Sequence, residues 1–254
     1  SAPAAYFFPM TTRMTRVDVF KGPAAIRFGP QTVGGAIDFV TRNPPQEGHT
    51  GMIDLAGGMY HYGKAHGYWG YGTDRYGVLL EGAHIQSDGF QDIDGGGDAG
   101  FRKTELMAKG RYRLFKEGKT RHDLHLKLGY QMEQSNQSYL GLSLEDFRDT
   151  PYRRYAAGRN DQLDTSRYQV EVAHTWKVRG RFDLRTTAYR HDFERTWLRA
   201  NQFRDGPSFR DVLDNPGGGT NAVFYDVLTG NADSQTPGES IMLISNARRF
   251  VSQG

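Results

Sequence analysis

Residues 17–43 read VDVFKGPAAIRFGPQTVGGAIDFVTRN, and the rest of the chain is interpreted outward from this stretch. Two short alternating runs, 17–20 and 36–41, flank a centre that contains six Gly and Pro residues. Alternating runs are typical of β-strands, and Gly and Pro mark turns. The stretch therefore predicts a compact strand–loop–strand unit. Such a unit is too small to form a core of its own and must pack inside a larger structure.

Four ordered segments carry a family resemblance: VDVF at 17–20, KGP at 21–23, RFGPQ at 27–31 and GGAIDFVT at 34–41. Together they resemble the end of the plug domain of TonB-dependent outer-membrane receptors. The RFGPQ version is most similar to the ferric-citrate receptor branch. A phosphate-binding loop does not fit, because the stretch has no GxGxxG and no Lys-Ser/Thr pair to close it.

The composition indicates a β-rich protein with many turns. The chain has 254 residues, with 32 Gly, 14 Tyr, 15 Phe and no Cys, which excludes disulfides and thiolate metal sites. Basic and acidic residues are interspersed and the formal net charge is only +3, so nucleic acid is not expected as a partner. Mean hydropathy is −0.67. No segment approaches the roughly 18 consecutive apolar residues of a membrane helix. This criterion does not detect the strands of membrane β-barrels, because their apolar and polar residues alternate.

Repeated alternating runs begin at residue 51. The clearest, 123–133, places Leu, Tyr and Met on one face and mostly charged residues on the other, and 105–114 and 168–178 repeat the pattern. Period two over such a length matches the roughly 9–11 residues of a tilted membrane strand. Aromatic residues on the apolar faces are candidates for an interfacial girdle, with core packing as the alternative: Tyr112, Tyr130, Tyr168 and Trp176.

The opposite, charged faces are expected to line a wet lumen and to hydrogen-bond the plug. The residues expected there are Lys109, Arg111, Arg113, Asp123, Lys127, Glu133 and Glu171. Short connections (73–75, 116–119 and 179–180) alternate with long ones (87–100, 135–166 and 199–238). Outer-membrane barrels show this alternation, with short periplasmic turns and long extracellular loops. The alternation that begins at 182–188 passes into a polar segment, which is expected to lie above the membrane.

The predicted fold class is all-β and membrane-embedded. Residues 1–46 are expected to be the C-terminal part of a plug domain. Residues 47–254 are expected to form about eight antiparallel strands of a larger transmembrane β-barrel. Plugged transporters of this kind close with about 22 strands, so the chain is expected to be part of a longer receptor.

The resemblance implies a receptor in the outer membrane of a Gram-negative bacterium. Such a receptor binds a ferric siderophore or ferric citrate and imports it with energy transmitted by TonB. Its implied partners are the TonB–ExbB–ExbD complex, the ferric chelate and outer-membrane lipid or lipopolysaccharide. No enzyme, catalytic residue or resident cofactor is predicted, since no nucleophile motif such as G-x-S-x-G is present. Two alternatives stay open: a receptor for cobalamin or a carbohydrate, and a stand-alone β-rich binding or adhesion module.

The first candidate ligand-binding group lies in the plug stretch. By resemblance, Gln31 matches the ligand-contacting Gln of the Gly-Pro-Gln segment in the ferric-citrate branch. Arg27 and Thr32 lie beside it. The alternative interpretation of Gln31 is a turn residue that satisfies local backbone groups.

The second candidate group lies in the long connection 135–166 and consists of Arg148, Arg153 and Arg154. Arginine offers planar, bidentate donors to carboxylates and suits an anionic ferric chelate. The alternative is a solvated loop in which these arginines pair with the neighbouring acids.

No metal site is predicted. The acids at 88, 92, 94 and 98 lie among glycines and offer the oxygen ligands of a hard cation, but their spacing lacks the acidic closure of an EF-hand. A flexible polar loop is the favoured interpretation. The eight His residues show no zinc-binding spacing.

Overall fold

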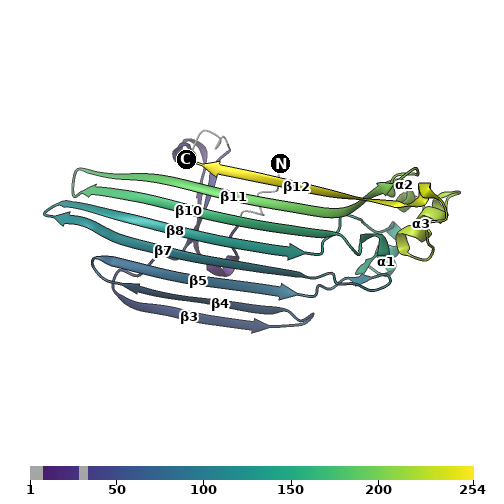
Figure 1. The fold of residues 1–254 in the computed structure, drawn as a ribbon, viewed down its shortest axis with the longest axis horizontal. Helices are drawn as coiled ribbons and strands as arrows, with labels where there is room; N and C mark the ends of the chain where they lie inside the picture. Colours follow the sequence, from purple (N-terminus) through teal and green to yellow (C-terminus); the bar gives the residue numbers. More distant parts are fainter. Residues whose placement is uncertain (1–7, 29–33) are drawn as a thin grey trace.

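One large antiparallel sheet dominates the structure, and a ribbon from the N-terminus lies across its strands (Figure 1). The computed structural model describes residues 8–28 and 34–254, apart from the side chains at 24, 27, 28 and 116. Within that part, the sheet has eight strands in the order β12-β11-β10-β8-β7-β5-β4-β3. They are β3 (Gly48–Gly57), β4 (Gly63–Gly72), β5 (Tyr76–Ser87), β7 (Phe101–Glu117), β8 (Thr120–Ser135), β10 (Gln162–Val178), β11 (Phe182–Phe203) and β12 (Ile241–Gln253).

This sheet, called the wall below, confirms the predicted antiparallel all-β class. Each strand pairs antiparallel with its neighbours in the sheet. The turns at 73–75, 118–119 and 179–181 lie at one end of the wall, and the connections with helices gather at the other end (Figure 1). The predicted alternation of short and long connections is confirmed, except that β3 and β4 are joined at the helix end by only residues 58–62.

The N-terminal ribbon pairs β1 (Met14–Phe20) with β2 (Ala36–Thr41), as predicted from the two alternating runs. A 3-10 turn, Thr11–Arg13, precedes it, and the segment Gly22–Phe28 is also 3-10 helical. We call the described part of residues 8–46 the N-terminal unit. It lies against one face of the wall and crosses the strand direction (Figure 1).

The long connections contain three short α-helices, α1 (Leu144–Asp149), α2 (Phe209–Asp214) and α3 (Asn221–Thr229). Ser143 caps α1 by accepting a hydrogen bond from the backbone N–H of Asp146, and Ser208 forms a capping box with Asp211 at α2. An apolar cluster joins α2 and α3 to the end of β11: Phe203, Val212, Val227 and Leu228. The connections are therefore packed structures. A two-residue parallel pair, β6 (Asp92–Ile93) with β9 (Arg153–Arg154), links two of them.

Strand β11 extends well beyond its apolar alternation. The apolar alternation fades after residue 188, but the strand continues without interruption to Phe203. It pairs with β10 up to Leu198 and with β12 from Arg190 to Phe203. Backbone pairing on both sides extends the strand through a segment whose side chains are too polar to predict it.

The two faces of the wall differ in chemistry. Side chains that point away from the N-terminal unit are apolar and exposed, among them Leu80, Leu106, Tyr112, Leu126, Leu128, Tyr168, Val170, Val172 and Trp176. The residues between them point toward the N-terminal unit and are largely charged, as predicted. Arg111, Arg113 and Asp123 are buried there. No helix in the described part of the chain is long and apolar enough to cross a membrane.

Glycines let the chain pass close to the wall where the N-terminal unit joins β3. A Cβ on Gly72 would lie 2.1 Å from the carbonyl oxygen of Pro45, and one on Gly70 would lie 2.9 Å from Pro45 Cδ. A Cβ on Gly77 would lie 3.1 Å from Pro44 Cβ. These adjacent strand positions form a groove without side chains that holds residues 44–46 against the sheet.

Gly72→Ala should disrupt this contact, because backbone atoms of Pro45 occupy the space that the new methyl group needs. We expect a loss of about 1–3 kcal/mol in the free energy of unfolding and faster proteolysis at residues 44–48. Denaturant titration and limited proteolysis measure these effects. Gly110→Ala is the matched control, since its Cβ would have only one neighbour within 4 Å, at 3.9 Å. Equal stability of the two variants would contradict the steric argument.

Candidate functional site

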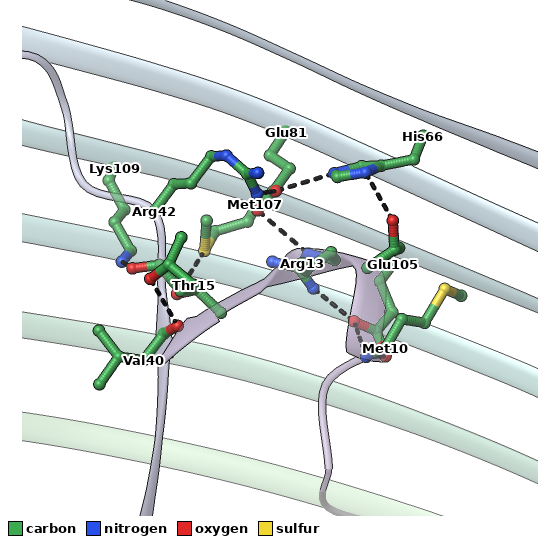
Figure 2. Close-up of polar contacts among 12 residues, drawn as sticks. Met10, Arg13, Thr15, Val40, Arg42, His66, Glu81, Glu105, Met107 and Lys109 are labelled. Atoms are coloured by element: carbon green, nitrogen blue, oxygen red, sulfur yellow. Dashed lines mark hydrogen bonds and ion pairs between the residues drawn. The ribbon is translucent and has the colours of Figure 1, made fainter. Parts of the chain in front are cut away.

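A buried ionic cluster joins the N-terminal unit to the wall (Figure 2). Arg13 is only 5% exposed, and its guanidinium lies between two carboxylates of neighbouring strands. Its Nε is 3.2 Å from Glu81 on β5, and its Nη1 is 2.5 Å from Glu105 on β7. Glu105 also accepts a hydrogen bond from the backbone N–H of Met10 at 3.1 Å. One side chain of the 3-10 turn is thereby fixed to two strands of the wall.

His66 on β4 extends the cluster to a third strand. Its Nε2 lies 3.0 Å from Glu81, and its Nδ1 lies 2.9 Å from the Thr12 hydroxyl. Through its two ring nitrogens, His66 links the 3-10 turn to β5. Two further cations lie at the edge of the cluster: Arg42 is 3.5 Å from Glu81, and Lys103 is 3.6 Å from Glu105. Each buried carboxylate therefore has more than one positively charged or N–H partner.

A second set of contacts holds the residues that lead out of the N-terminal unit. Lys109 donates to the carbonyl oxygen of Thr41 at 3.2 Å and to Asn43 Oδ1 at 3.1 Å. Arg111 donates to the carbonyl oxygen of Gln46 at 3.5 Å, and also to that of Thr73, in the turn between β4 and β5, at 2.9 Å. Both cations belong to the face of β7 that was expected to hydrogen-bond the plug, and both donate to the N-terminal unit. That this unit is a plug stays a prediction.

A cavity of about 510 Å³ lies beside the ionic cluster, between the N-terminal unit and the wall. Arg13 and Phe39 line it from the N-terminal unit, and Lys127, Arg167 and His191 line it from the wall. Its wall side is rich in cationic and hydrogen-bonding groups. Apolar side chains such as Phe193 and Phe250 also line it, so the cavity is mixed in character.

At the other end of the wall, a polar network ties three long connections together. Arg153 contacts Asp94 at 2.9 Å and Asp146 at 2.9 Å. The second carboxylate oxygen of Asp146 accepts hydrogen bonds from Tyr155 at 2.5 Å and from Tyr225 of α3. We call these five residues the loop clamp.

The clamp shifts the ionisation of its members. Burial raises the pKa of Asp146, but hydrogen bonds from Tyr155 and Tyr225 and the charge of Arg153 outweigh it, so the pKa lies below its ordinary value. Burial and the hydrogen bond to Asp146 both raise the pKa of Tyr225. The clamp thus favours a carboxylate and two neutral phenols near neutral pH.

The structure places the predicted binding residues unevenly. Gln31 and Thr32 lie outside the described residues, as does the side chain of Arg27. Ligand binding by these three stays a prediction. Arg148 lies exposed on α1, and its binding of a ligand stays a prediction.

Two of the predicted loop arginines have internal partners. Arg153 belongs to the loop clamp. Arg154 is 2% exposed and donates to the carbonyl oxygens of Asn136, at 2.5 Å, and Gly158. These contacts favour the alternative of internal pairing for Arg153 and Arg154, and their role toward a ligand stays untested.

The acids of the Gly-rich connection are used in local contacts. Asp94 pairs with Arg153, Asp88 with His61, and Asp98 accepts the backbone N–H of Gly100 at 2.7 Å. Among the described residues no group of three or more His, Cys, Asp or Glu could hold a metal ion.

Sequence reasoning missed the ionic cluster. Glu81 is an isolated acid in the run 76–82, which is otherwise apolar on both faces. An acid in such a place indicates a buried partner of opposite charge, and this was the one clue that the sequence offered. Arg13 gave no signal, because its partners lie 68 and 92 residues away and only the fold brings them together.

No protein-family model matches the chain. Two solved structures of mutants of the ferric enterobactin receptor from Pseudomonas aeruginosa are similar in part. The first has a TM-score of 0.47 and 18% identity and covers 75% of this chain and 28% of that one. The second, in complex with enterobactin, has a TM-score of 0.44 and 17% identity and covers 75% and 29%. The chain therefore spans less than a third of these receptors. Both carry the name of a ferric enterobactin receptor and neither that of a ferric-citrate receptor.

Glu105→Gln keeps the shape of the ionic cluster but removes a negative charge from buried Arg13. We expect docking of the N-terminal unit to weaken by about 1.5–3 kcal/mol, because Arg13 loses one of its two charged partners and keeps only the carboxylate of Glu81. Hydrogen exchange of the β1 and β2 amides measures this docking. Glu194→Gln on the opposite face is the control, since Glu194 is exposed and pairs with exposed Arg249. Unchanged exchange in Glu105→Gln would show that the cluster does not hold the unit.

Asp146→Asn should open the loop clamp. Charged hydrogen bonds of this kind contribute roughly 1.5–3 kcal/mol, so we expect about ten-fold or greater loss of hydrogen-exchange protection in α1 and α3. Because the folded pKa of Asp146 is lowered, wild-type protection should be full at neutral pH and decline as the pH falls through and below the ordinary Asp range. The variant should lack this decline. Exposed Asp149→Asn on the same helix is the control, and an identical profile for both variants would contradict the clamp.

Proposed function

We propose that this chain is part of a TonB-dependent outer-membrane receptor that imports a ferric siderophore or ferric citrate. In this proposal the N-terminal unit is the end of the plug, and the wall is part of a transmembrane β-barrel. The observation that carries the proposal is the two-sided chemistry of the wall. Its exposed face is apolar, and its opposite face is charged and covered by the unit that carries the plug-like motifs.

The height of the apolar face supports a membrane setting. On β10, the side chains that point outward are those of Tyr168, Val170, Val172, His174 and Trp176. Eight residues of strand span about 26 Å, which at a tilt of about 40° covers roughly 20 Å of height, most of the roughly 25 Å apolar band of outer-membrane barrels. Tyr168 packs against Tyr130 of β8 with the rings tilted and their centroids 5.0 Å apart, as expected for an aromatic girdle at one border.

The opposite border also carries aromatic rings. Trp176 lies 5.3 Å from His122 and 4.9 Å from Phe182, between ring centroids, beside the short turns. An exposed apolar surface that extends over so many adjacent strands is not stable in water and marks a membrane or protein contact. The alternation along each strand matches lipid outside and a wet lumen inside.

The arrangement of the connections gives the proposal an orientation. The packed connections with α1–α3 would face the outside, and the short turns and residues 44–47 would face the periplasm. Within the described residues β3 and β12 each pair on one side only, so the proposal requires further strands of the receptor to continue the wall.

The proposed mechanism is capture and release without chemistry on the chelate. The outer connections and the tip of the plug bind the ferric chelate. Energy transmitted by TonB then displaces the plug. The ionic cluster around Arg13 is a firm but polar attachment, since its charges can be rehydrated when the unit moves.

The complete receptor that carries this chain is expected to fractionate with the outer membrane and to require detergent. In detergent it should bind one of a panel of ferric citrate, ferric siderophores and cobalamin, and Gln31→Ala should weaken that binding about ten-fold if Gln31 contacts the ligand. Equilibrium dialysis with labelled ligand measures both. Binding of cobalamin alone, or of no panel member, would overturn the iron proposal. Monodisperse behaviour without detergent would support the soluble binding module instead.

A further inference from the structure

Two cavities lie one after the other between the N-terminal unit and the wall. The first, of about 510 Å³, is the cavity beside the ionic cluster, and the second has a volume of about 330 Å³. Asp38, Phe39 and Thr41 of β2 line both cavities from the N-terminal unit. Lys127 of β8 lines both from the wall. The two spaces therefore meet beneath β2, at Lys127.

The cavities follow the strands of the wall toward the short turns. On β7, Met107 lines the first cavity and Arg111 the second, and on β10, Gln169 lines the first and Glu171 the second. Both strands run toward the short turns, so their higher residue numbers lie nearer that end. The row of cavities thus starts at the ionic cluster and ends beside residues 43–46, where the N-terminal unit leads into β3.

The lining of the two cavities carries more positive than negative charge. Arg13 is neutralised by the ionic cluster, and Arg185 contacts Glu171 at 3.2 Å. Within the part of the chain that the structure describes, the other cations of the lining are Lys109, Arg111, Lys127 and Arg167, and the other acid is Asp38. A cleft whose walls carry an excess of one charge concentrates ions of the opposite charge. The cavities therefore favour an anion.

Lys127 is the cation at the junction, and its ammonium has no acceptor in the described part of the chain. The side chain is half-buried, and its nitrogen is open to solvent. Its register partner on β7 is Lys109, and its partner on β10 is Glu171, which Arg185 already holds. Like charges at opposed positions destabilise a sheet, so stability alone does not favour a lysine here. An anion that enters the cavities would supply the acceptor that Lys127 lacks.

The size and the apolar part of the lining suit an organic anion. Pockets for small ligands have volumes of roughly 300–1,000 Å³, and both cavities fall in that range. Phe39 of β2, Phe193 of β11 and Phe250 of β12 line the first cavity and can pack against an organic body. A small inorganic anion would leave most of this space unfilled.

We propose that the two cavities form a binding site for an organic anion with several carboxylate or catecholate oxygens, with the ammonium of Lys127 as its central donor. The inference rests on the proposed function, in which the occupant is an anionic ferric chelate that moves past the N-terminal unit. Lys127 then determines which chelates pass, whereas the outer connections determine which are captured. Neutral chelates such as ferric trihydroxamates would gain nothing from its charge.

The test compares import with capture in the complete receptor. Cells that express it receive labelled iron as ferric citrate, a ferric tricatecholate or a neutral ferric trihydroxamate, and equilibrium dialysis in detergent gives the Kd of each chelate. Lys127→Gln should lower the import rate of the anionic chelate about ten-fold and leave its Kd unchanged. Lys127→Arg should restore most of the import, because it restores the positive charge. Hydrogen exchange of the β1 and β2 amides should match the wild type in both variants, which excludes lost docking as the cause.

Lys177→Gln is the matched control. Lys177 on β10 is an exposed lysine that pairs with Asp183 at 2.5 Å and lines neither cavity, so its loss should leave import unchanged. If Lys127→Gln imports as fast as this control, or if Lys127→Arg is as slow as Lys127→Gln, the site is wrong while the proposed function stands. A Kd that rises in step with the loss of import would place Lys127 in capture and overturn its role in passage. If the wild type imports only the neutral chelate, the charge class is wrong, and if it imports no ferric chelate, the proposed function itself fails.

Discussion

The buried charge of Arg13 is the interaction on which the arrangement of this molecule depends. A guanidinium that is almost excluded from solvent must be neutralised, and here Glu81 and Glu105 do so from neighbouring strands. Successive side chains of a strand point to opposite faces. Once these two acids point at Arg13, their apolar neighbours Leu80 and Leu106 must point away. One ion-pair cluster therefore sets which face of the wall meets the N-terminal unit and which face carries the apolar surface.

The two ends of the wall are built on different principles. At the turn end, glycines at 70, 72 and 77 leave space for residues 44–46, and the rings of Pro44 and Pro45 and the backbone of Pro45 lie directly against the strands. At the helix end, the connections have an apolar cluster of their own and are tied by the carboxylate of Asp146. A scaffold that holds its long connections so firmly can present oriented side chains. Arg199 of β11 is an example, because packing against the rings of Tyr139 and Trp197 restricts the conformations of its side chain.

The arginines of the long connection show why residue type alone does not identify a site. Arg153 and Arg154 were reasonable candidates for anion binding, yet their donors are directed to Asp94, Asp146 and backbone carbonyls. Arg199 was not singled out, since nothing near it in the sequence distinguishes it from other arginines. Its surroundings come from Tyr139, sixty positions earlier. Whether an arginine is used internally depends on neighbours that only the fold supplies.

What the sequence determined by itself was the local pattern. Period-two alternation predicted the strands and their polar and apolar faces, as with Lys109 and Leu106 on β7, and the Gly and Pro positions predicted the hairpin of the N-terminal unit. These properties depend on side-chain direction and backbone freedom within a few residues. The tertiary structure decided the pairing of Arg13 with acids 68 and 92 positions away, the extension of β11 by its neighbours, and the convergence on Asp146. Such contacts depend on strand register and on the path of the chain. Neither can be deduced from the residues of one short segment.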